Sequence, residues 1–249
     1  MEPFVPPTAP SSWWTTILGA GLFAKAVLLV LLVFSVISWT IIIKKLRLFR
    51  KIKRENKTLL SLFQHRRSVL QFQKLTAEYK NTPLAKILAR GLYEWDNLKK
   101  PLSLTNPAPT QKMATQTISS SALAQLLPNV HDAMNRTSSF EFEQIERSLP
   151  FLATISSVSP FLGLLGTVWG VLSALLNVKN IPIVTLQIIA PGVSDALVTT
   201  VAGLLVAIPA LIFYNYFVGK LRDISTESER FISAIISDFR KEIVFSNLK

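Results

Sequence analysis

Residues 148–178 read SLPFLATISSVSPFLGLLGTVWGVLSALLNV, which is 31 consecutive residues without a charged side chain. A bilayer is crossed by about 20 apolar helical residues, and buried helices of soluble proteins seldom run past about 18 residues without a charge. Two further charge-free runs lie at 26–43 and 196–219. The three runs therefore predict an all-α integral membrane protein with three transmembrane helices.

The composition supports this class and argues against a soluble enzyme. Of the 249 residues, 49% are hydrophobic and 17% are charged, whereas soluble domains average about 25% charged residues. The absence of cysteine excludes a disulfide framework, a thiolate zinc site and a cysteine nucleophile. The two histidines, His65 and His131, lie too far apart in sequence for ligand spacing. We therefore expect no cofactor, no metal site and no enzymatic activity.

The distribution of positive charge predicts the orientation. The first apolar run is followed by KKLRLFRKIKR, which begins with Lys44, Lys45 and Arg47, and residues 44–149 hold 19 of the 27 Lys and Arg residues. Because basic residues stay on the cytoplasmic side, the N-terminus should face outward. Trp13 and Trp14 suit the aromatic belt at the outer interface.

Two other interpretations of these segments fit less well. A cleavable signal peptide needs a basic n-region, which MEPFVPPTAP lacks, and a shorter apolar run. The basic run also resembles a nucleic-acid patch when it is read alone. Next to a membrane helix, however, topology and attraction to anionic headgroups explain it more economically.

These observations divide the chain into seven segments. The three transmembrane helices are expected to continue as long helices into the cytoplasm. A flexible loop rich in Pro, Ser and Thr is expected at 99–121. Further helices are expected at 83–98, with Pro83 in its first turn, and at about 131–148. The segments are a periplasmic N-terminus that allows an interfacial helix (1–22), transmembrane helix 1 (23–43), a cytoplasmic helical domain (44–149), transmembrane helix 2 (150–177), a short periplasmic loop (178–194), transmembrane helix 3 (195–219) and a cytoplasmic C-terminal helix (220–249).

Small residues recur on one face of each of the last two spans. Gly163, Gly166 and Gly170 are spaced three and four residues apart in the second span. Gly203 and Ala207 are four residues apart in the third span. Small residues at this spacing let a second helix backbone approach closely. The pattern predicts helix packing at these positions.

Polar residues accompany the small ones. Thr167 lies in the second span, and Asp195, Thr199 and Thr200 lie in the third. A threonine in a membrane helix often bonds only its own i−4 carbonyl, and a shared polar pathway is the alternative. Asp195 is the only residue in these two spans that is charged at neutral pH, and it stands at the outer end of one. Because a proton-driven protein needs a titratable group in the membrane, that acid would have to come from another chain.

Three stretches resemble one family. They are FSVISWTIIIKK (34–45), ERSLPFLATISSVSPFLGLLGTVWGV (146–171) and IIAPGVSDALVTTVAGLLVAIPALIFYN (188–215). Together with the order of spans they resemble the TolQ/ExbB proteins of Gram-negative inner membranes, within the MotA/TolQ/ExbB proton channel family. FSVISWTIII and GTVWG are more similar to the TolQ branch.

The resemblance implies a homopentamer around a central pore that holds the membrane helices of a TolR/ExbD-like partner. Such assemblies conduct protons with the partner and pass protonmotive energy to a TolA/TonB-like periplasm-spanning protein, for outer-membrane maintenance or import. Thr167 and Thr200 fall on the family's pore threonines. Asp195 stands where the family usually has glutamate, so its side chain is one methylene shorter. A partner-independent ion channel and a structural membrane scaffold remain alternatives from other classes.

Overall fold

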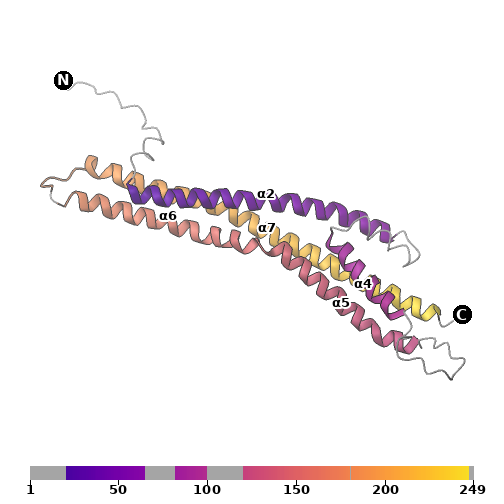
Figure 1. Cartoon of the computed structure of the whole chain (residues 1–249). Helices are drawn as coiled ribbons and strands as arrows, with labels where there is room; N and C mark the ends of the chain where they lie inside the picture. The colour runs from indigo at the N-terminus through magenta and orange to yellow at the C-terminus, as the bar shows by residue number, and fades with distance from the viewer. Residues whose placement is uncertain (1–20, 65–81, 100–119, 180, 247–249) are drawn as a thin grey trace, which may run out of the picture. The chain divides into compact units, whose positions relative to one another are not determined.

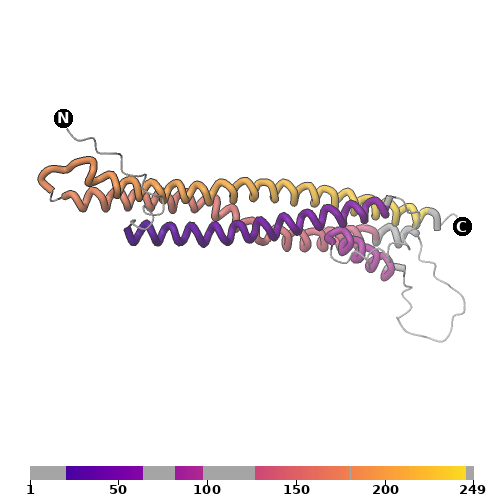
Figure 2. Tube along the Cα trace, turned by 90° about the horizontal axis from the view of Figure 1, so that it is seen from above, coloured from indigo at the N-terminus to yellow at the C-terminus, as the bar shows by residue number. Residues whose placement is uncertain are grey.

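A computed structural model describes residues 21–64, 82–99, 120–179 and 181–246. Every regular element within these ranges is an α-helix, which confirms the all-α part of the predicted fold class (Figures 1 and 2). Three helical stretches, which include α2, α6 and α7, are long and apolar enough to cross a membrane. Trp13, Trp14 and most of the predicted 99–121 loop lie outside the described residues. The helices are α2 (Leu22–Gln64), α4 (Pro83–Lys99), α5 (Ser120–Glu146), α6 (Leu149–Asn177) and α7 (Leu186–Ser246).

The chain forms two compact units. The first comprises Met1–Lys45 and Ser148–Phe217, and the second comprises Leu46–Arg147 and Val218–Lys249. The first unit therefore contains the apolar parts of α2, α6 and α7, and the second contains the charge-rich parts of the chain. The membrane borders themselves remain predictions.

Two helices begin earlier than the sequence predicts. Helix α7 starts at Leu186, inside the predicted 178–194 loop, and α5 starts at Ser120. The charge of Asp195 predicts a border at 195, but a single carboxylate does not end a helix. Pro128 lies inside α5 because the residues around it, Leu127 and Val130, are anchored in the core of the second unit.

The core of the second unit is built from apolar side chains of α2, α4, α5 and α7. Trp95 of α4 stacks on Phe239 of α7 with 4.4 Å between ring centroids, and Phe63 of α2 meets Phe231 of α7 edge-on at 5.1 Å. Leu59 of α2 is fully buried in the same cluster. Because burial of each such side chain contributes about 1.5–3 kcal/mol, this core holds the four helical segments together.

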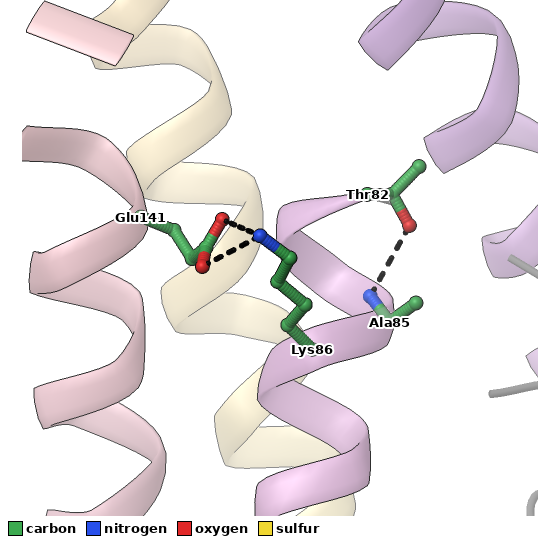
Figure 3. A network of polar contacts seen from close by, with 4 residues as sticks. All are labelled: Thr82, Ala85, Lys86 and Glu141. Carbon is green, nitrogen blue, oxygen red and sulfur yellow. Dashed lines mark hydrogen bonds and ion pairs between the residues drawn. The ribbon is translucent and has the colours of Figure 1, made fainter. Parts of the chain in front are cut away.

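Polar contacts fix the start of α4 and its contact with α5 (Figure 3). Thr82 Oγ1 accepts a hydrogen bond from the Ala85 amide at 3.3 Å, which caps the helix one residue before Pro83. One turn further, Lys86 Nζ donates to both carboxylate oxygens of Glu141 on α5, at 2.9 and 2.7 Å. The Glu141 side chain is only 11% exposed, so it depends on this partner for its charge.

Replacing Lys86 with methionine is expected to lower the free energy of unfolding by about 1–2 kcal/mol, because Glu141 then loses the donor that compensates its burial. Arg90→Met is the matched control, since Arg90 forms a more exposed pair with Glu94 on the same helix. Such exposed i,i+4 pairs contribute only about 0.3–0.5 kcal/mol. Thermal unfolding of both variants in detergent measures the difference. Equal effects would show that the Lys86–Glu141 pair is no more important than a surface pair.

Candidate functional site

Helices α6 and α7 approach each other closely in the first unit, along what we call the glycine seam: Gly163, Gly166 and Gly170 of α6 with Ala196, Thr199 and Gly203 of α7. A Cβ atom on Gly163 would lie 2.8 Å from the Thr199 carbonyl oxygen. One on Gly203 would lie 2.6 Å from the Ser159 carbonyl oxygen, and one on Gly170 would lie 2.6 Å from the Ala196 Cβ. Ala207, one turn after Gly203, is also buried. Only glycine permits these backbone distances.

Three threonine hydroxyls gather at the centre of the seam. The Gly163 carbonyl oxygen accepts hydrogen bonds from Thr167 Oγ1 at 3.0 Å, Thr199 Oγ1 at 3.1 Å and Thr200 Oγ1 at 3.2 Å. The hydroxyls of Thr167 and Thr200 are also within hydrogen-bonding distance of each other across the two helices. Because each hydroxyl has one proton, the one that donates to the other does not donate to the carbonyl at the same time. The absence of a side chain at residue 163 lets the α7 hydroxyls reach this backbone oxygen.

The structure combines the two interpretations of the threonines, back-bonding within a helix and a polar group shared between helices. Thr167 bonds its own i−4 carbonyl, as an isolated membrane threonine does. The same carbonyl also receives hydroxyls from the neighbouring helix, so the group is a shared polar cluster and not three separate back-bonds. A hydroxyl both donates and accepts, which allows this cluster to hydrate or hydrogen-bond an ionisable group without holding a charge itself.

The three threonines differ in access. Thr199 has no exposed surface and also bonds the Ala196 carbonyl at 2.7 Å, so its hydroxyl is held inside the seam. A place for Thr199 along the proton pathway, beside Thr167, Thr200 and Asp195, remains a prediction. Thr167 and Thr200 are half-buried, so they combine membership of the cluster with surface that another chain can contact.

Asp195 lies on α7 one turn before Thr199, about 6 Å away along the helix axis. Its side chain is half-buried. Among the described residues it forms no hydrogen bond or ion pair. Asp195 is thus near the threonine cluster but does not belong to it.

The basic residues predicted at the inner interface occupy one continuous part of α2. Lys44 and Arg47 are exposed, whereas Lys45 is only 6% exposed. This burial lowers the pKa of the Lys45 ammonium group because it removes water from the charged form. The three residues therefore do not present one uniform charged surface.

Two further residues lie beside the glycine seam and are not predicted from the sequence. Ser159 is fully buried, and its Oγ has no hydrogen-bond partner among the described residues. Gly192 faces α6, where an added Cβ would lie 2.8 Å from the Ala174 Cβ. Ser159 stands four residues before Gly163, and this i, i+4 spacing is the only sequence feature that places it on the glycine face.

Most of the apolar surface of the first unit points outward. Only 22–28% of the most apolar part of each candidate span is buried within the chain. Large side chains such as Phe161 and Leu205 are 70% and 67% exposed. Such a surface requires lipid or other protein chains around it.

Comparison with known proteins identifies relatives of this chain. Residues 105–230 match the model of the MotA/TolQ/ExbB proton channel family. The "Tol-Pal system protein TolQ" of Haemophilus influenzae is 32% identical over 227 residues, which cover 90% of this chain and 92% of that protein. TolQ of Pseudomonas aeruginosa is 32% identical over 87% of each chain. The "Biopolymer transport protein ExbB" of Neisseria meningitidis is 29% identical over 76% of this chain and 80% of its own.

Proposed function

Because the chain belongs to the MotA/TolQ/ExbB proton channel family, we propose that it is the TolQ-type subunit of a protonmotive-force-driven motor in the Gram-negative inner membrane. The observation that carries the proposal is the bond between the Thr167 and Thr200 hydroxyls over the Gly163 carbonyl. It places a neutral polar cluster between two helices that are long and apolar enough to span the membrane.

The cluster needs an acid from another chain in order to work with protons. Within the predicted second and third spans, Asp195 is the only residue that is charged at neutral pH, and it stands at the end of a span. A TolR/ExbD-like subunit with a single membrane helix supplies a carboxyl group beside Thr167 and Thr200. These hydroxyls then hydrogen-bond that carboxyl group as it gains and loses its proton.

The energetics favour gating by neutralisation. One charge moving through the membrane potential releases about 2.3 kcal/mol per 100 mV. Desolvating a permanently charged acid costs at least as much, so the partner helix moves more easily once its acid is protonated. Movement of the partner against α6 and α7 converts proton entry into mechanical work.

The proposed assembly is a homopentamer whose central pore holds the partner helices. Its N-terminus is periplasmic and its C-terminus is cytoplasmic, as the positive charges of 44–149 and 220–249 favour. A TolA/TonB-like protein receives the energy on the periplasmic side. The TolQ alignments cover more of the chain than the Neisseria ExbB alignment, which supports a role in outer-membrane maintenance over import.

Proton flux into proteoliposomes tests the proposal. The chain alone is expected to leak no more than protein-free vesicles, because it lacks an acid at mid-membrane depth. Co-reconstitution with a single-span partner that carries a membrane aspartate is expected to produce flux under an imposed potential. The same partner with that aspartate changed to asparagine is the control. Equal flux with and without the partner would instead identify a self-sufficient channel.

A further inference from the structure

One face of α2 in the second unit carries four basic side chains, Arg47, Arg50, Arg54 and Lys57, which we call the basic face. Their spacing of three, four and three residues places them on the same side of the helix. All four are exposed, and none forms an ion pair with a described residue. The opposite side of the same helix segment packs into the unit through Phe49, Ile52 and Leu59.

Most of the basic face lies several helical turns from the expected membrane border. Lys57 lies 13 residues beyond Lys44, which is about 20 Å along a helix. With residue 44 at the membrane border, as the sequence predicts, this exceeds the Debye length of about 8 Å at physiological ionic strength. The outer residues of the basic face therefore call for an acidic partner other than the membrane.

The second unit also carries an acidic surface, which we call the acidic groove. A groove between α5 and α7 is lined by Asn135, Ser139 and Glu229, among others, and adjoins a hollow along α5 that shares Asn135 and Ser139. The hollow adds Asp132 and Glu143 and contains one basic residue, Arg136. Glu143 and Glu229 form no ion pair with a described residue, so no described cation compensates their charges.

The two surfaces lie at the same height along α7. Asn56, on the buried side of the same turns of α2, donates to Glu227 at 3.4 Å, and the acidic groove includes Ser225, Glu229 and Ser233 of the same helix segment. The basic face lies on α2 and the acidic groove on α5 and α7, so the two surfaces are formed by different helices. The basic face extends over about 15 Å, and Asp132 and Glu143 are separated by about 17 Å.

We infer that the basic face of α2 docks in the acidic groove of a second copy of this chain. Two different surfaces of one subunit make a head-to-tail contact, which closes into a ring when the rotation allows it. Equal height along α7 suits a ring whose axis runs parallel to the helices. The inference rests on the self-assembly included in the proposed function and specifies which surfaces meet.

Charge reversal tests the pairing on the full-length chain in nanodiscs. The first variant carries Arg50→Glu and Arg54→Glu, the second carries Glu143→Arg and Glu229→Arg, and the third combines all four changes. Native mass spectrometry measures the assembled fraction. Each pair of reversals is expected to raise the dissociation constant about tenfold or more, because like charges then face each other. The combined variant is expected to recover to within about threefold of the wild type.

Arg240→Glu is the matched control, since Arg240 is an exposed residue on α7 outside both surfaces. It is expected to assemble like the wild type. Unchanged assembly in the first and second variants, or no recovery in the combined variant, would overturn the inference and leave self-assembly intact. Intact assembly with lost proton flux in the second variant would overturn it too, because the groove would then serve a different chain. A monomeric wild type would overturn the proposed assembly itself.

Discussion

Thr200→Val is expected to lower partner-dependent proton flux about ten- to a hundredfold while the complex still assembles. Valine keeps the shape of threonine but removes the hydroxyl that bonds Thr167 and the Gly163 carbonyl. A hydrogen bond to a charged group contributes about 1.5–3 kcal/mol, and each 1.36 kcal/mol corresponds to a factor of about ten in rate. Thr167→Val is expected to act in the same way, because it removes the other half of the pair.

Thr154→Val provides the matched control on α6. Thr154 is exposed, and its hydroxyl bonds only the Pro150 carbonyl, at 3.0 Å, so flux should remain within about twofold of the wild type. Thr200→Ser, which keeps the hydroxyl, should recover most of the flux. The readouts are proton flux in proteoliposomes and partner co-purification. Full flux in both valine variants would exclude a role of the hydroxyl pair in conduction.

Gly203→Ala is expected to lower the free energy of unfolding by about 1–3 kcal/mol, which is the usual cost of overpacking. The new methyl group would lie 2.6 Å from the Ser159 carbonyl oxygen and 3.1 Å from the Gly163 Cα. Both are backbone atoms, so neither yields by a rotamer change. Helices α6 and α7 must separate, and the hydroxyls of α7 then lose their reach to the Gly163 carbonyl. We therefore expect flux to fall together with thermal stability.

Gly219→Ala, on the same helix, separates this effect from helix propensity. Nothing lies within 4 Å of a Cβ atom at Gly219, and alanine favours a helix over glycine by up to about 1 kcal/mol. This control should be neutral or more stable in a thermal unfolding assay. Equal stability of the two variants would mean that the glycine seam accommodates an added methyl group without a loss in the free energy of unfolding.

The helical class and the approximate positions of the three apolar helices could be predicted from the sequence. A run of more than about 18 residues without a charge is a local property of the sequence, so it can be recognised without knowledge of the fold. Helix ends could not be predicted in the same way. The early starts of α7 at Leu186 and α5 at Ser120 depend on packing around them, which a charge or a proline in the sequence does not reveal.

The candidate site could be predicted by residue type but not in its detail. Thr199 and Thr200 are neighbours in sequence, and a helix turns by about 100° between them. Which of them enters the seam depends on the rotation of α7, and the contact of Gly203 with the Ser159 backbone fixes this rotation. The burial of Ser159 could not be predicted for a related reason. Ser156 and Ser157 are the same residue type nearby, and only the packing of α7 against α6 distinguishes Ser159 from them.

The oxygen at which the three hydroxyls meet belongs to the main chain of Gly163. No codon change deletes it, so alanine scanning and natural variation alter its donors while leaving the acceptor in place. Unnatural-residue incorporation offers the missing tool: an α-hydroxy acid at position 164 converts the linkage into an ester, whose carbonyl is a poorer acceptor. The Gly163 carbonyl oxygen therefore cannot be tested by side-chain substitution and has to be tested by altering the backbone.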